Sequence, residues 1–78
     1  MTIQETYLEK IDRARNMARY YRLSVVATLF GEWAMVREWG RIGSRGQSCE
    51  FWCGSTEDAT ALLNEQRALR VKRGYKLG

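Results

Sequence analysis

Residues 37–47 read REWGRIGSRGQ and combine side chains suited to a flat, negatively charged ligand. The guanidinium groups of Arg41 and Arg45 can form paired hydrogen bonds to phosphate or carboxylate, and the indole of Trp39 can stack on a base or a sugar. Three glycines interrupt the stretch at intervals of three, which is typical of a backbone that turns or approaches another group closely. We interpret it as a turn whose side chains project from the rim of a sheet, with core packing of Trp39 as the alternative.

Other chemistries lack the residues they need. A nucleotide-binding glycine loop opens into a helix, whereas a strand-like pattern follows these glycines. The chain has no histidine, the usual base for a cysteine or serine nucleophile. Cys49 and Cys53 cannot complete a zinc site by themselves, and in a strand they stand roughly 13 Å apart, too far for a disulfide. We therefore predict reduced, core-filling cysteines, no enzymatic activity, no metal and no cofactor.

Charge is distributed unevenly along the chain. The formal net charge is +4, from thirteen basic and nine acidic residues, and ten of the basic residues are arginines. Residues 10–22 hold five basic residues and one acid, residues 67–78 hold five and none, and residues 46–66 hold four acids and no base. This distribution predicts a basic side and a more acidic side, which is typical of a protein that binds a polyanion. The alternative is a mildly basic surface with no partner.

Apolar and polar residues alternate in the first two thirds of the chain. From Tyr21 to Leu29 the alternation predicts a half-buried strand. Residues 32–39 and 47–54 continue the pattern on either side of the glycine-containing connection, with Trp33 and Trp52 as core candidates, and residues 5–11 form a weaker strand or an extended arm. We expect an antiparallel meander of three to five strands.

Residues 55–74 change to helical signals. Ser55 is a good N-cap with Asp58 three residues later, and Gly74 is well placed to end the helix. An apolar stripe that can lie on the sheet consists of Ala59, Leu62, Leu63, Gln66 and Leu69. The sequence therefore predicts an α+β fold, a small antiparallel sheet with one C-terminal helix on one face, formed by residues 1–78 as a single domain with its core between about 8 and 75.

A hairpin would bring the basic and aromatic residues together. If it is centred near Gly31, residue 31−n pairs with residue 31+n, so that Tyr21 stands opposite Arg41 and Arg19 opposite Gly43. Such a fold-back gathers at one end of the sheet Asn16, Arg19, Tyr21, Trp39 and Arg41. This geometry favours nucleic-acid binding over an unoccupied basic surface.

These residues together resemble a WGR domain, a family named after the tripeptide that is here Trp39-Gly40-Arg41. The resemblance rests on WGRIG followed by GQ, on the segment N-x-x-R-Y-Y that starts at Asn16, and on the helix followed by KRGY; it extends from about Leu8 to Tyr75. WGR domains occur in poly(ADP-ribose) polymerases, where they recognise DNA ends and breaks, and in short bacterial proteins. The resemblance implies a small antiparallel sheet with one helix packed on it.

By the same resemblance Trp39 stacks on a terminal nucleotide sugar with Arg41 as its charged companion, while Asn16 and Arg19 hold the 5′ phosphate. Arginine replaces the family's lysine at position 19, and Tyr75 is a looser match. These 78 residues include neither the catalytic domain nor the zinc fingers of the polymerases, so we expect no polymer synthesis. The predicted nucleic-acid contacts are Asn16, Arg19, Tyr21, Trp39, Gly40, Arg41, Arg45, Gln47, Lys72 and Tyr75.

We thus expect a stand-alone bacterial module that recognises DNA ends or nicks, with DNA preferred over RNA. The alternative is a protein-interaction adaptor that uses the open face of the sheet with Trp33 or Trp52. Residues 23–30 are too short and begin too late for a signal peptide or a membrane span. We therefore expect a cytoplasmic, monomeric protein with no membrane partner.

Overall fold

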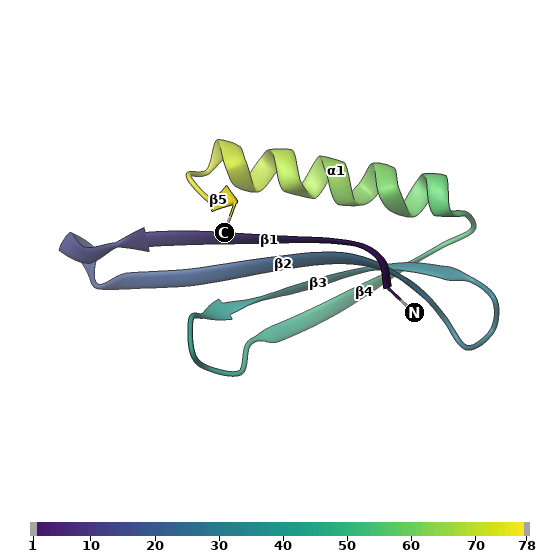
Figure 1. The fold of residues 1–78 in the computed structure, drawn as a ribbon, viewed down its shortest axis with the longest axis horizontal. Helices are drawn as coiled ribbons and strands as arrows, with labels where there is room; N and C mark the ends of the chain where they lie inside the picture. The colour runs from purple at the N-terminus through teal and green to yellow at the C-terminus, as the bar shows by residue number, and fades with distance from the viewer. Residues whose placement is uncertain (1, 78) are drawn as a thin grey trace.

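Five strands and one helix make up the part of the chain that the computed structural model describes, residues 2–77 (Figure 1). They are, in chain order, β1 (Thr2–Asp12), the 3-10 turn η1 (Arg13–Arg15), β2 (Met17–Ala27), β3 (Trp33–Arg41), β4 (Gln47–Cys53), α1 (Thr56–Lys72) and β5 (Lys76–Leu77). The strands form one antiparallel sheet in the order β4-β3-β2-β1-β5. The predicted α+β fold is confirmed, and the N-terminal segment is a full strand rather than a loose arm.

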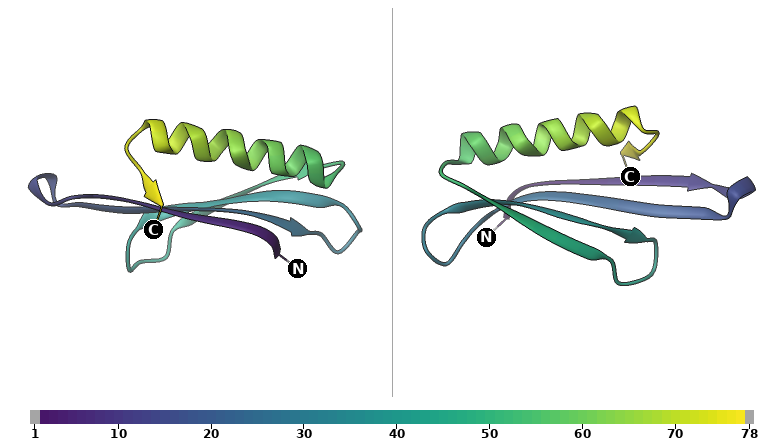
Figure 2. Two further views of the ribbon diagram at one scale, coloured as in Figure 1. Left: turned by 45° about the horizontal axis from the view of Figure 1, so that its top comes forward. Right: turned by 180° about the vertical axis from the view of Figure 1, so that it is seen from behind.

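The core lies between the helix and one face of the sheet. Alternate residues of β2 point to this face, and Leu23 and Val25 are fully buried there together with Met35 of β3. Leu63 of α1 and Leu8 of β1 are the other large side chains that are fully buried. Figure 2 shows α1 on this one face and no other described element on the opposite face. The alternation of β2 is what one covered face requires.

The helix begins and ends where its sequence predicts. The Ser55 hydroxyl oxygen accepts a hydrogen bond from the Asp58 N–H at 3.1 Å, and Glu57 and Asp58 lie in the first turn. Gly74 has φ +99°, and the Tyr75 N–H then donates to the Arg70 carbonyl at 3.0 Å, which satisfies an end carbonyl. α1 is neither long nor apolar enough to cross a membrane.

Part of the predicted helix stripe is wrong. Ala59 and Leu63 are buried as expected, but Leu69 is 37% exposed. The positions that face the sheet are 59, 62, 63, 66 and 70, so that Leu62 also packs on the core as expected and Arg70 occupies the place expected for Leu69. One residue turns a helix by about 100°, which moves Leu69 off the covered face.

The register of the β2–β3 hairpin also differs from the prediction. Tyr21 pairs with Trp39, and Arg19 pairs with Arg41. The turn is centred on Phe30, because the Thr28 N–H donates to the Glu32 carbonyl at 2.8 Å. This bond closes a three-residue loop, residues 29–31, and Gly31, at φ +79°, is therefore the last residue of that loop rather than its centre. The displacement is an even number of residues, so every side chain stays on its predicted face.

The tryptophans are not equally buried. Trp33 and Trp39 are half-buried on the helix side and pack against the core. Trp52 is 53% exposed, which corrects its assignment to the core. Its neighbours in β4, Phe51 and Cys53, face the helix, and alternation sends Trp52 to the open side.

Candidate functional site

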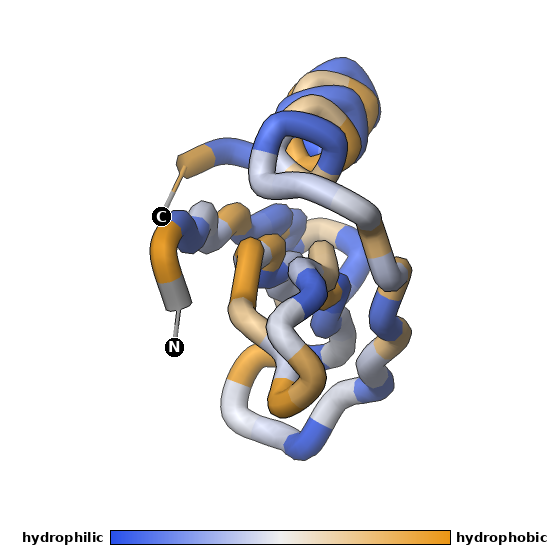
Figure 3. Tube along the Cα trace, turned by 90° about the vertical axis from the view of Figure 1, so that its right-hand side faces the viewer, coloured by the Kyte–Doolittle hydropathy of each residue, from blue (hydrophilic) through white to orange (hydrophobic). Residues whose placement is uncertain are grey.

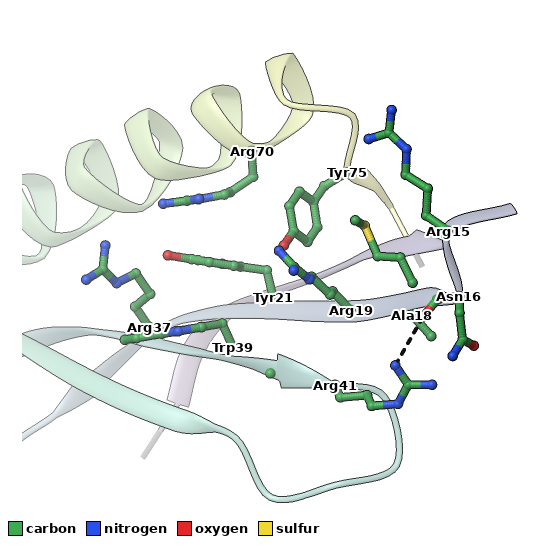
Figure 4. A pocket seen from close by; sticks show the side chains of 12 residues that line it. Arg15, Asn16, Ala18, Arg19, Tyr21, Arg37, Trp39, Arg41, Arg70 and Tyr75 are labelled. Atoms are coloured by element: carbon green, nitrogen blue, oxygen red, sulfur yellow. Dashed lines mark hydrogen bonds between the residues drawn. The ribbon is translucent and has the colours of Figure 1, made fainter. Parts of the chain in front are cut away.

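A groove of about 660 Å³ lies between the C-terminal end of α1 and the sheet end where β2 begins and β3 terminates (Figure 4). The fold brings η1 and the last turn of the helix to the same end of the molecule (Figure 1). The groove is lined by Arg15, Asn16, Met17, Ala18, Arg19, Tyr21, Arg37, Trp39, Gly40, Arg41, Arg70 and Tyr75. Five of these described residues are arginines and none is acidic.

Three aromatic rings line its inner part. Tyr21 and Trp39, cross-strand neighbours, have ring centroids 6.0 Å apart and planes 18° from parallel. Tyr75, which follows the end of the helix, meets the Tyr21 ring edge-on at 5.8 Å. Tyr21 is buried, whereas Trp39 and Tyr75 are half-buried and border the groove. The groove therefore presents aromatic surface to a ligand.

Two guanidinium groups lie against these rings. The Arg70 Cζ is 4.3 Å from the Tyr21 centroid, and the Arg37 Cζ is 4.8 Å from that of Trp39 (Figure 4). The Nε atoms of both arginines are buried and have no hydrogen-bond partner among the described residues. Cation–π contacts hold these charges without a neutralising carboxylate, so their outer N–H groups stay available to an anion.

Arg19 and Arg41 lie at the mouth of the groove, where they pair across β2 and β3. Both are exposed, and an Arg41 Nη1 donates to the Asn16 carbonyl at 3.4 Å. Asn16 follows η1 in the left-handed conformation at φ 51°, and Asp12 caps that turn through the Ala14 N–H at 3.1 Å. The β1–β2 turn and the end of β3 are thus joined at the rim.

The three glycines have two different roles. Only Gly43 has a positive φ, at +89°, as the turn interpretation requires. Gly40 and Gly46 lie at a close crossing of backbone: a Cβ on Gly40 would be 2.8 Å from the Gly46 Cα, and one on Gly46 would collide with the Trp39 carbonyl and the Tyr20 hydroxyl. The glycine of the tripeptide therefore allows the β3–β4 connection to close beside Trp39.

Seven of the ten predicted contact residues line the groove. The other three, Arg45, Gln47 and Lys72, are exposed residues outside its lining. Arg37 and Arg70 line it but were absent from the prediction. Arg37 alternates with Trp39 on one face of a strand, and Arg70 lies eleven residues after Ala59 on the buried helix face. These two spacings were the signals in the sequence that Arg37 and Arg70 face the groove.

The open face of the sheet has a smaller hollow of about 270 Å³, lined by Tyr7, Tyr20, Arg22, Glu38, Gly43 and Ser44. Tyr7 and Tyr20 stack there at 6.0 Å, and Arg22 pairs with Glu38 at 3.2 Å. Burial, together with the Glu38 carboxylate, raises the pKa of Tyr20 above its ordinary value of 10.0. The pKa of Tyr7 is raised by burial and by its hydrogen bond to Glu9.

Residues 2–77 contain no group of three histidine, cysteine or acidic side chains placed to hold a metal ion. Cys49 and Cys53 are free thiols, both half-buried. The groove, with its arginines and rings, is the part of the described surface best suited to hold a ligand.

Comparison with known proteins is consistent with this view of the groove. Residues 4–77 match the WGR domain family, whose members are binding domains often linked to nucleic acid. The chain is also similar to the uncharacterized protein y4dW of Sinorhizobium fredii (strain NBRC 101917 / NGR234), with 44% identity over 70 residues. That alignment covers 90% of this chain and 34% of the relative, so the chain spans about a third of that protein's length. No solved structure gives a significant match.

Proposed function

The chain belongs to the WGR domain family, and from this membership and the lining of the groove we propose that it binds nucleic acid there, at DNA ends or nicks. The observation that carries the proposal is the gathering of five arginines around three aromatic rings with no acid among the lining residues. Arginine recognises phosphate through paired hydrogen bonds, and aromatic rings accept the flat faces of bases and sugars. The module binds without catalysing a reaction.

Arg19 and Arg41 are the proposed phosphate contacts. They are exposed, stand opposite each other at the groove mouth and lie beside Asn16, whose amide adds hydrogen-bonding groups. Each phosphate neutralised on a duplex contributes about 0.9 to the slope of log affinity against log salt. Two such contacts give a slope of about −1.8, or roughly a 12-fold loss of affinity between 50 and 200 mM salt.

Trp39 is the proposed stacking residue. It is half-buried and borders the groove, while Tyr21 supports it from the neighbouring strand. Bases inside a duplex are already stacked on one another, whereas an end or a nick leaves a terminal base and sugar accessible. This difference supports a preference for termini, and the occurrence of WGR domains in DNA-recognising poly(ADP-ribose) polymerases supports a preference for DNA.

The assay is fluorescence anisotropy with a labelled, 5′-phosphorylated duplex, competed by closed circular DNA of equal base-pair concentration. Trp39→Ala should weaken binding about 5- to 150-fold, the equivalent of roughly 1–3 kcal/mol for one stacked base. Arg41→Ala should weaken binding and lower the salt slope by about 0.9. Thermal unfolding establishes that each variant is folded.

Matched controls are Trp52→Ala and Arg67→Ala, which remove the same residue types outside the groove. Both should bind the duplex as the parent does. Parental affinity in both Trp39→Ala and Arg41→Ala would eliminate the groove as the binding site. Equal competition by circular and linear DNA would eliminate the preference for ends.

A further inference from the structure

The end of the molecule opposite the groove carries an exposed apolar patch. At the tip of the β2–β3 hairpin Leu29 is 99% and Phe30 79% exposed, and Trp52 of β4 is 53% exposed. The Phe30 and Trp52 ring centroids are 6.4 Å apart, so the hairpin tip and the edge strand form one patch. Figure 3 looks onto this end, with the apolar hairpin tip toward the viewer. Large apolar side chains clustered on a surface mark an interaction site.

Beside the patch runs an unprotected sheet edge. β4 is the outermost strand, and its outer side pairs with no other strand among the described residues. Edge strands are usually guarded by lysine, proline or several charges, but the seven residues of β4 include neither lysine nor proline and only one charge, Glu50. At the opposite edge β5 covers part of β1, which also carries several charges. β4 is therefore the edge best suited to accept another strand.

The charge at this end is acidic. Residues 23–36 and 46–66, which include the hairpin tip, β4 and the start of α1, hold no lysine or arginine. Glu50 lies two residues before Trp52 on the same face of β4, and Glu32 lies beside the hairpin tip; both are exposed. An acidic rim around apolar side chains favours a basic partner and repels nucleic acid and anionic lipid headgroups.

A second copy of the chain suits this edge poorly. Two β4 strands paired about a two-fold axis would bring two acidic edges together, with the Glu50 carboxylates facing one another. We therefore propose that β4 and the hairpin tip bind an extended segment of a partner protein, which adds to the sheet as a sixth strand. Opposite Glu50 it presents a basic residue, and two residues along, opposite Trp52, it presents an apolar one.

Two labelled nine-residue peptides test this proposal: in both, an apolar residue stands two positions from a variable residue on the same face, and the variable residue is lysine in one peptide and glutamate in the other. The full chain should bind the lysine peptide at least tenfold more tightly by anisotropy. Hydrogen exchange should show new protection of β4 amides. Glu50→Lys should remove the preference or reverse it, and since Glu50 is exposed this change leaves the core intact. Trp52→Ser should weaken both peptides.

Val71→Ser is the matched control, because Val71 is 51% exposed on α1 and away from this edge. It should bind both peptides as the parent does. Equal affinity for the two peptides, protection of β1 instead of β4, or self-association through β4 would each overturn the proposal. Trp52→Ser should still bind duplex ends, so a failure here is distinguishable from a failure of the nucleic-acid groove.

Discussion

Replacing Gly46 by alanine should destabilise the fold by about 2–3 kcal/mol, near the upper end of the usual cost of overpacking. The new methyl group would overlap the Trp39 carbonyl and the Tyr20 hydroxyl. The carbonyl belongs to β3, which is paired on both sides, and Tyr20 is only 7% exposed and stacks on Tyr7. Neither obstacle can move without disturbing the sheet, which is why the cost lies near the upper end.

Thermal unfolding by circular dichroism measures this cost. A chain of 78 residues has an unfolding entropy of about 0.16 kcal/mol/K, so 2–3 kcal/mol corresponds to a fall in Tm of roughly 12–18 °C. Gly54→Ala is the control, because a Cβ at Gly54 meets nothing within 4 Å. It should change the stability by less than about 0.5 kcal/mol.

The double variant Gly46→Ala/Tyr20→Phe separates the two obstacles. Removing the Tyr20 hydroxyl should return about 1 kcal/mol of the loss, measured as a coupling energy in a double-mutant cycle. The Trp39 carbonyl remains, so recovery should be partial. If Gly46→Ala costs no more than Gly54→Ala, the close crossing of the two backbone segments beside Trp39 is not a feature of the folded protein.

Two further predictions concern the charged and titratable groups. Arg70→Gln should weaken duplex binding and lower the salt slope by about 0.9 if Arg70 contacts a phosphate. Arg67→Gln, on the same helix but outside the groove, should leave the affinity and the salt slope unchanged. An unchanged slope in both variants would show that Arg70 is not part of the site. Because Tyr7 and Tyr20 have raised pKa values in the folded state, their contribution to stability is complete below pH 10 and is lost as the pH rises through the folded values. Melts between pH 9 and 11 should therefore show falling stability, less steeply in Tyr20→Phe, and equal slopes in parent and variant would contradict the shift.

Local signals predicted most of the fold. The alternation from Tyr21 onward placed the central strand and its buried face, and Ser55 and Gly74 marked the ends of the helix to within a residue. These features depend on neighbouring residues, which a sequence displays directly. The hairpin register depends instead on which loop position Gly31 takes, and both turns are compatible with the same sequence. That is why the pairing was wrong by two residues while the faces were right.

The site was predicted less completely, because two of the arginines that line the groove lie within the apolar pattern of a strand and of the helix. Arg37 and Arg70 occupy positions at which an apolar pattern expects a core residue, so each interrupts a stripe instead of extending it. They are accommodated because their planar groups lie on Trp39 and Tyr21. The Arg70–Tyr21 contact joins α1 to β2 across 49 positions of sequence, so only the folded chain brings the two residues together, whereas Arg37 and Trp39 are two residues apart in β3.

The separation of charge between the two ends gives the molecule a permanent electric moment along its longest dimension, which measures 45 Å. A highly charged anionic polymer would exert a torque on this moment before any contact forms, and would turn the arginine-rich end forward. More collisions would then begin in a productive orientation, within a range of about 10 Å at 0.1 M salt. The acidic end would at the same time point away from the polymer into solvent, where it stays accessible to a second partner.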